Sequence, residues 1–161
     1  MIRKTILSAL LLLAVVVLVS CSKGVKAEPL IGLSYSYNGF FVDGVSLYQA
    51  SDKAKLKNKE IKLGESLVII VENLRGFTVE NEEIYPACKI SVTDPDGNVI
   101  MESEDIYDGQ SYKKEQNNFS LTVTMGNPIV AGKEYVTTAN LYDKKNPENK
   151  IDITVKSEVI E

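Results

Sequence analysis

The sequence predicts an all-β protein, an antiparallel sandwich of about seven to nine strands that follows an N-terminal leader. Short runs rich in valine, isoleucine, leucine and tyrosine recur at intervals of about ten residues, a spacing typical of sandwiches and barrels. Glycine, proline, asparagine and aspartate separate these runs, and turns favour these residues. Beyond the leader no long helical period is sustained. Two sheets, each apolar on one face, would stack to bury a common core.

The expected strands occupy residues 33–37, 40–48, 60–63, 67–73, 88–93, 99–102, 119–125, 134–142 and 150–159. Several of them alternate strictly between apolar and polar side chains. In 119–125 the apolar positions are Phe119, Leu121, Val123 and Met125, with serine, threonine and threonine between them. Because successive side chains of a strand point to opposite faces, this alternation buries one face and leaves the other in water.

Two turns are expected to join neighbouring strands into hairpins. In residues 94–98, DPDGN, Pro95 presets the backbone for the first central position of a type I turn, and Gly97 takes the left-handed position that follows. This predicts a hairpin between the strands at 88–93 and 99–102. Residues 143–149, which contain an Asn-Pro pair, predict a looser hairpin between the last two strands.

The stretch FSLTVTMGNPIVAGKEYVTTANLYD, residues 119–143, resembles the E–F–G portion of immunoglobulin-like and fibronectin type III domains. The resemblance covers residues 60–159 and makes Tyr135 the "tyrosine corner", whose hydroxyl group bonds to backbone upstream. The core tryptophan and paired cysteines of antibody domains are missing, so the resemblance is to the immunoglobulin-like architecture alone. The chain also resembles the small immunoglobulin-like lipoproteins of Gram-negative bacteria.

The N-terminus has the composition of a secretory signal peptide. Arg3 and Lys4 precede an apolar run over residues 6–19. This run is shorter than the roughly 20 residues of a membrane-spanning helix. Residues 18–21, LVSC, resemble the lipobox of bacterial lipoproteins, which implies cleavage before Cys21, a thioether from its sulfur to diacylglycerol, and acylation of the new amino group, with palmitate as a suitable label.

This resemblance divides the chain into three parts. Residues 1–20 are the predicted signal peptide, 21–32 the lipidated cysteine and a tether, and 33–161 a single sandwich domain. Each buried acyl CH₂ contributes about 0.8 kcal/mol, so two or three chains would hold the protein at the membrane. Because Ser22 stands where inner-membrane lipoproteins commonly have aspartate, we expect the outer membrane of the cell envelope. Whether the domain faces the periplasm or the cell surface is left open.

The charge of the chain argues against nucleic acid as a partner. Removal of residues 1–20 takes away two of 18 basic residues and none of 22 acidic ones, which leaves a net charge of −6. Phosphate binding needs a basic surface. With Cys21 lipidated, Cys88 has no cysteine to pair with, and we expect it to be a small buried side chain.

The sequence gives little support for an enzyme. It contains no histidine, which removes Ser-His-Asp, Cys-His and histidine–metal arrangements. Ser111 and Lys114 fit S-x-x-K, but the companion motifs of the serine–lysine enzymes are missing. A calcium site at Asp94 and Asp96 is an alternative. The hairpin turn by itself explains why these residues are present, so they do not require a bound ion. We therefore expect no catalytic residue, no cofactor and no metal.

Aromatic side chains in expected loops are the remaining candidates for a binding surface, because tyrosine and phenylalanine are rigid anchors. These candidates are Phe77, Tyr85, Tyr107 and Tyr112. They lie in or next to loops 76–86 and 104–117. The hypothesis is a lipid-anchored, non-enzymatic binding or adhesion module for a protein or glycan partner. The alternatives are a structural subunit of an envelope or fimbrial assembly and, less favoured, a carbohydrate-active enzyme that uses two carboxylates.

Overall fold

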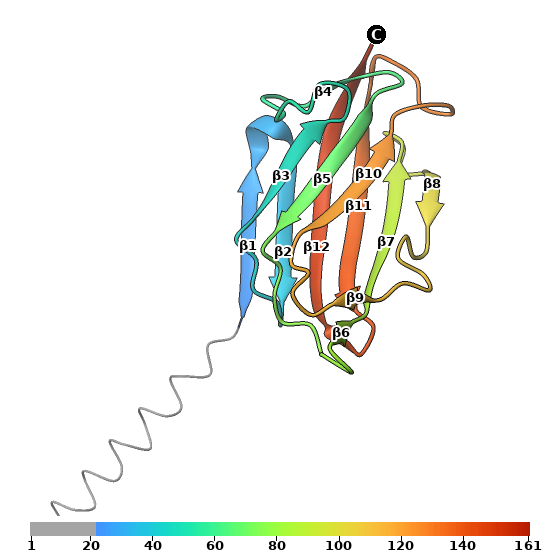
Figure 1. Cartoon of the computed structure of the whole chain (residues 1–161). Coiled ribbons are helices and arrows are strands. Elements are labelled where there is room, and N and C mark those ends of the chain that lie inside the picture. The colour runs from blue at the N-terminus through green and yellow to red at the C-terminus, as the bar shows by residue number, and fades with distance from the viewer. Residues whose placement is uncertain (1–21) are drawn as a thin grey trace, which may run out of the picture.

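The computed structural model describes residues 22–161, so the predicted signal peptide and the predicted lipidation at Cys21 lie outside the described residues. Within this range twelve strands and one 3-10 turn, η1 (Pro29–Ile31), form two sheets that pack face to face, with a small two-stranded sheet at one end (Figure 1). No helix among these residues is long and apolar enough to span a bilayer. The predicted all-β class is confirmed.

The larger sheet consists of seven strands. Its order is β1 (Lys23–Glu28), β2 (Leu33–Asn38), β12 (Asn146–Ile160), β11 (Lys133–Asp143), β7 (Pro86–Thr93) and β8 (Val99–Ser103), with β4 (Glu60–Lys62) beside β12. The pairing of β4 with β12 is parallel, and the other pairings in the sheet are antiparallel. Strands β2 and β4 pair with successive parts of β12, so together they cover one edge of this long strand.

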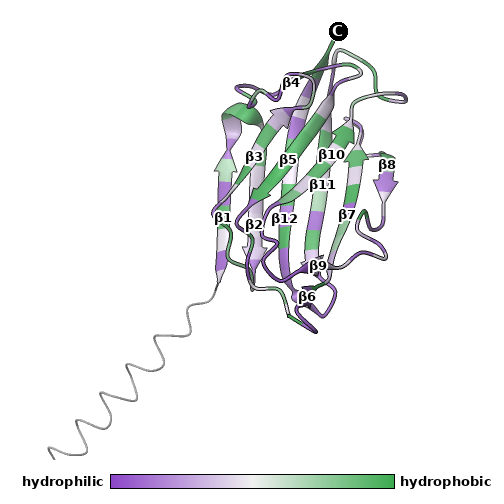
Figure 2. Cartoon of the chain, viewed as in Figure 1, coloured by the Kyte–Doolittle hydropathy of each residue, from purple (hydrophilic) through white to green (hydrophobic). Residues whose placement is uncertain are grey.

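The smaller sheet faces the larger one and has three strands. Its order is β10 (Phe119–Thr124), β5 (Ser66–Glu72) and β3 (Gly44–Gln49). Strand β10 buries its apolar positions and exposes Ser120, Thr122 and Thr124, as the alternation predicts. Figure 2 shows this alternation as bands of contrasting hydropathy along the strands. The core therefore lies between the inner faces of the two sheets.

The strand order is that of an immunoglobulin-like sandwich. In immunoglobulin terms β3, β5 and β10 correspond to strands A, B and E, and β7, β8, β11 and β12 correspond to C, C′, F and G. The predicted tyrosine corner is also present: the Tyr135 hydroxyl accepts a hydrogen bond from the Val130 amide at 3.0 Å and donates to the Val130 carbonyl at 3.3 Å. The immunoglobulin-like prediction is thus confirmed. The strand count exceeds the predicted seven to nine because of β1 and two further strands of two residues each.

The predicted tether over residues 21–32 is wrong for the part that the structure describes. Lys23–Glu28 forms β1, which pairs with β2 from Lys23↔Asn38 to Glu28↔Leu33. The Gly39 amide donates to the Ser22 carbonyl at 2.9 Å, so ordered pairing begins at Ser22. Strand β1 is mostly exposed and lies at the sheet edge, so its side chains show no apolar alternation to reveal a strand.

The DPDGN hairpin forms as predicted. Gly97 has φ +86°, and the Asp94 amide donates to the Asn98 carbonyl at 2.9 Å. One carboxylate oxygen of Asp94 accepts from the amides of Asp96 at 2.9 Å and Asn98 at 2.8 Å. These hydrogen bonds, led by that from the Asn98 side chain, lower the pKa of Asp94. The turn therefore gives this carboxylate a structural role without a bound ion.

Candidate functional site: a cavity between two loops

The two loops that were expected to carry the binding surface lie side by side at one end of the sandwich (Figure 1). Their central residues form the short strands β6 (Glu83–Ile84) and β9 (Tyr112–Lys113), which pair antiparallel. A further backbone hydrogen bond, from the Lys114 amide to the Glu82 carbonyl at 3.0 Å, extends this pairing. Segments about 30 residues apart in the sequence thus form one surface.

A cavity of about 340 Å³ lies between these loops. Its apolar lining comes from Leu74, Phe77, Val79 and Ile84, and its polar lining from Arg75, Lys114, Glu115, Gln116 and Asn117. Val79 is 47% exposed, which is high for a large apolar side chain. A cavity with an apolar patch and a few polar groups is the usual form of a binding site. Its lining suits a ligand or partner group that is itself amphiphilic.

Two ion pairs join charged side chains at this end. Lys114 pairs with Glu82, and the Lys145 ammonium lies 2.6 Å from a Glu80 carboxylate oxygen. A carboxylate-based glycosidase needs two carboxyl groups across a cleft. The cavity between the loops is lined by one carboxylate, that of Glu115, and a second cavity, beside β10, by that of Glu102. In the same residues no group of three or more cysteine, aspartate or glutamate side chains is arranged to hold a metal ion.

Three of the four aromatic candidates belong to a core cluster. In this cluster the Phe77 ring centroid lies 5.4 Å from Phe119, and those of Tyr107 and Tyr112 lie 6.0 and 6.1 Å from it. Tyr107 is only 8% exposed, and its hydroxyl donates to the Ser120 carbonyl at 3.3 Å. Burial raises the pKa of this hydroxyl. The expectation that Tyr107 is an exposed loop anchor is therefore wrong, because the loop folds its ring inward onto Phe119.

The remaining candidates differ in their surroundings. Phe77 is the one candidate that lines the cavity, where it also packs against Phe40 with a centroid distance of 4.6 Å. Tyr85 directly follows β6 and is half-buried, and the Lys145 ammonium lies 4.8 Å from its ring centroid. The sequence-predicted residues thus contribute mainly to the support of the cavity. The residues that line it most openly, such as Val79 and Lys114, were not among the predicted ones.

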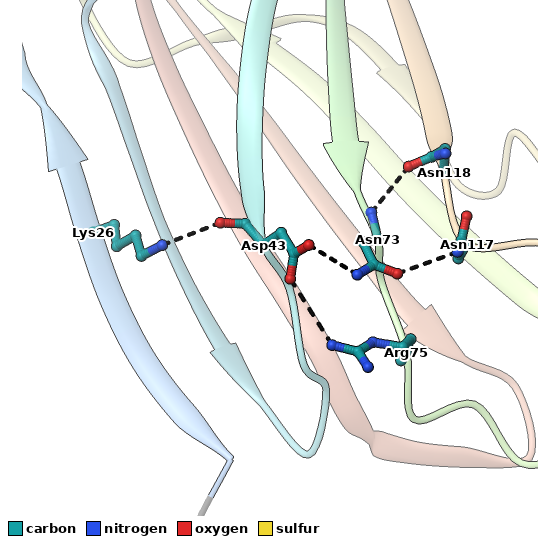
Figure 3. A network of polar contacts seen from close by, with 6 residues as sticks. All are labelled: Lys26, Asp43, Asn73, Arg75, Asn117 and Asn118. Atoms are coloured by element: carbon teal, nitrogen blue, oxygen red, sulfur yellow. Dashed lines mark hydrogen bonds and ion pairs between the residues drawn. The ribbon is translucent and has the colours of Figure 1, made fainter.

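Figure 3 shows a polar network that includes Arg75 and Asn117, two of the residues that line the cavity. Asn73 has a left-handed backbone with φ +51°, which asparagine tolerates better than most residues. Its amide donates to Asn118 Oδ1 at 2.9 Å, and its side-chain nitrogen donates to Asp43 at 2.8 Å. The Asn117 side chain donates to Asn73 Oδ1 at 3.1 Å, and Arg75 lies 3.9 Å from Asp43. The sequence signal for this network was weak, an asparagine at the end of an apolar run.

Asp105 fixes the start of the second loop. Its Oδ1 accepts from the amides of Cys88 at 3.0 Å and Tyr107 at 2.9 Å, and its Oδ2 lies 2.8 Å from the Lys144 ammonium. Burial alone would raise the pKa of Asp105, but the hydrogen bonds from Lys144, Cys88 and Tyr107 outweigh it and lower the pKa. The loop is thereby tied to both β7 and the β11–β12 hairpin.

This lowered pKa predicts a pH-dependent stability. A carboxylate whose pKa is depressed by folding stabilises the protein above its unfolded pKa of about 3.9, and this contribution is lost as the pH falls through the folded value. Asp105→Asn should therefore lower the free energy of unfolding by about 1–3 kcal/mol at pH 7, with a smaller difference in strong acid. Urea unfolding at both pH values measures this effect. Asp108→Asn, which changes an 89% exposed side chain, is the control and should have little effect.

The thiol of Cys88 is predicted to be unreactive in the folded protein. Cys88 is fully buried, and its burial, with the negative charge of Asp105, raises its pKa to about 12. Because the thiolate is the reactive form, a thiol reagent at pH 8 should leave Cys88 unmodified until the protein unfolds. The measurement uses Cys21→Ser to remove the other thiol, with Cys21→Ser/Val79→Cys as a positive control. Rapid modification of Cys88 under native conditions would contradict its placement in the core.

The fold and the cavity define a class of protein, an immunoglobulin-like sandwich with a loop-bounded cavity at one end. No protein-family model matches the chain, and no curated protein matches it. Among solved structures it is similar to an immunoglobulin-like protein from Pseudomonas aeruginosa, at 14% identity and a TM-score of 0.42, over 74% of this chain and 95% of that one.

Two further solved structures are similar to the chain. One is the PmoD soluble domain from a Methylocystis species, at 10% identity and a TM-score of 0.39, over 87% of this chain and 98% of that one. The other is chicken MD-1 complexed with lipid IVa, at 14% identity and a TM-score of 0.31, over 86% and 99%. At these TM-scores the similarity carries no argument about function. The fold assignment is based on the strand order and the tyrosine corner.

Proposed function

We propose that the protein is a lipid-anchored, non-enzymatic binding module of the bacterial envelope, and that its partner is a protein or glycan bound at the end formed by β6 and β9. The observation that carries the proposal is the cavity of about 340 Å³ between the paired loops. Its surroundings are held by the aromatic cluster beneath it and by the Asn73 network beside it. A preorganised surface of this kind loses little conformational entropy when it binds.

The lipid anchor is supported by the sequence alone. Residues 18–21, LVSC, end an apolar leader and resemble a lipobox, with Cys21 as the acceptor and the outer membrane as the expected location. Growth of the producing bacterium with radioactive palmitate should label the wild-type protein and not Cys21→Ser. An unlabelled wild-type band would contradict the anchor.

The binding role is tested with two matched surface variants. Val79→Asp places a charge in the cavity, while Val99→Asp places the same charge on the exposed edge strand β8; the two valines are 47% and 56% exposed. Envelope extracts and glycan arrays are probed with wild type and both variants. We expect a partner that binds wild type and Val99→Asp but is lost, by tenfold or more in affinity, from Val79→Asp. Retention by Val79→Asp, or no binding to wild type, would contradict the proposal.

A structural subunit is the second candidate, and one observation favours it. Within residues 22–161 no strand pairs with the outer edge of β10, and a crevice of about 300 Å³, lined in part by Val92, Met101 and Val123, lies beside this edge. An added strand could extend the sheet there. The Ser120 carbonyl accepts a hydrogen bond from the Tyr107 hydroxyl and therefore points away from β5. Residues two apart in a strand direct their backbone groups to the same edge, so the Thr122 amide also lies on this open edge of β10.

Strand addition to β10 would produce oligomers that a proline at position 122 disrupts, because proline removes that amide donor and leaves the bonds to β5 intact. Analytical ultracentrifugation of wild type and Thr122→Pro distinguishes the two functions. Oligomers in wild type that are lost in Thr122→Pro would favour the assembly role. A monomer in both would favour the binding module.

A further inference from the structure

The starting point is the short distance between the anchor and the folded domain. This step depends on the proposed function, since it takes Cys21 as the site of the lipid. The Ser22 carbonyl accepts a hydrogen bond from the Gly39 amide at 2.9 Å, and β1 begins at Lys23. One peptide unit, with about 3.8 Å between consecutive Cα atoms, therefore separates Cys21 from the paired backbone. Such a connection leaves the sandwich almost no freedom to move away from the bilayer.

Strands β6 and β9, whose loops bound the cavity, lie at the same end of the molecule as the start of β1 (Figure 1). Gly76, which lines the cavity, contacts the backbone of Gly39: a Cβ added to Gly76 would lie 2.8 Å from the Gly39 carbonyl oxygen. The Gly76 carbonyl also accepts from the Asn149 side chain at 2.7 Å, which brings in the β11–β12 hairpin. Contacts therefore lead from Ser22 through Gly39 to the wall of the cavity without a gap.

The segments that bound the cavity also define the end of the molecule that faces the anchor. We define the loop end as residues 76–86, 104–117 and 144–149, which are the two loops and the tip of the β11–β12 hairpin. These residues carry four basic and eight acidic side chains. Contact of the loop end with a bilayer therefore depends on the short connection to the anchor and not on attraction between charges.

We propose that the loop end faces the bilayer that carries the anchor and rests on its lipid headgroup layer. The cavity then opens within or next to the headgroup layer, and its partner has to lie at the lipid surface. A glycan carried on a lipid, or the surface-exposed part of a membrane protein, meets this condition. A large soluble protein is excluded from the cavity by the bilayer itself.

The experiment places an environment-sensitive fluorophore at either end of the anchored protein. Val79→Cys carries the label at the loop end, and Leu30→Cys carries it in η1, at the far end of β1. Both side chains are large, apolar and exposed, at 47% and 76%, so the two variants are chemically matched. The six residues of β1 place Leu30 about 20 Å along the strand from the end that carries Ser22. Cys88 is buried and takes no label.

The full chain is produced with its leader, and its mass is measured to show whether it carries the lipid. It is then reconstituted into vesicles of phosphatidylethanolamine and phosphatidylglycerol. These vesicles also contain a lipid with a fluorescence quencher attached to its headgroup. We expect the label at Val79 to lose most of its emission and the label at Leu30 to keep nearly all of it. Glu148→Cys, in the exposed β11–β12 hairpin of the loop end, serves as a second position should Val79→Cys fail to fold, and it should behave like Val79→Cys.

The outcomes separate the inference from the proposed function. A mass that includes the lipid, together with an unquenched label at the loop end, overturns the inference and leaves the anchor intact. Stronger quenching at Leu30 than at Val79 also overturns it, because η1 and not the loop end would then face the bilayer. A mass without the lipid overturns the anchor, and the inference with it.

Discussion

Replacement of Phe119 by alanine should lower the free energy of unfolding by about 3–5 kcal/mol, the range for buried phenylalanines. Phe119 is 2% exposed, and its ring lies between 5.4 and 6.1 Å from those of Phe77, Tyr107 and Tyr112. Deletion of the ring removes the shared contact of both loops and leaves a cavity that the rigid sheets cannot close. Chemical denaturation, followed by circular dichroism, measures the loss.

Phe41→Ala is the matched control for this prediction. The chemical change is the same, but Phe41 is 51% exposed and lies outside the buried core. We expect it to cost less than about 1 kcal/mol. If the two substitutions had equal effects, the aromatic cluster would not be the support of the loop end that the ring distances indicate. A loss of partner binding by a still-folded Phe119→Ala would show how far the cavity depends on this support.

Gly32→Ala should be the second large effect, about 3 kcal/mol or more. Gly32 has φ +71°, and a Cβ there would lie 2.1 Å from the carbonyl oxygen of Lys156. The Gly32 carbonyl in turn accepts from the Lys156 amide at 3.0 Å. The side chain could enter only if η1 and β2 moved away from β12, with loss of that bond. Thermal or denaturant unfolding measures the change.

Gly109→Ala separates backbone strain from the steric clash. Gly109 has nearly the same backbone, φ +70°, but nothing lies within 4 Å of a Cβ at this position. Its substitution should therefore cost only the strain of a left-handed alanine, about 1–2 kcal/mol. A Gly32→Ala variant as stable as Gly109→Ala would mean that the close approach of η1 to β12 is relaxed in solution.

Several elements of the fold could be predicted because their signals are local. The alternation in β10 assigned both its strand conformation and its buried face, and DPDGN fixed the β7–β8 hairpin by turn chemistry alone. Tyr135 could be identified from its place between a Pro-Gly connection and an alternating strand. In each case the residues that carry the pattern are themselves the residues that are buried or bent.

The candidate site could be predicted only in part. Loops 76–86 and 104–117 were identified by their composition, but composition does not say that β6 and β9 pair or that a cavity forms between them. Burial of Tyr107 depends on Phe119 and on the Ser120 carbonyl, which are supplied by another strand. The network around Asn73 likewise joins three separate segments, so no single stretch of the chain carries its signal.

The sequence by itself determined the all-β class, the inner faces of the main strands, one tight hairpin and the tyrosine corner. Tertiary structure alone decided that Lys23–Glu28 is a strand, that the two loops meet, and that Gly39 connects Ser22 with the wall of the cavity. The reason is that alternation and turn chemistry act over a few residues. Backbone pairing at a sheet edge and contact between distant loops depend on partners that only the folded chain brings together.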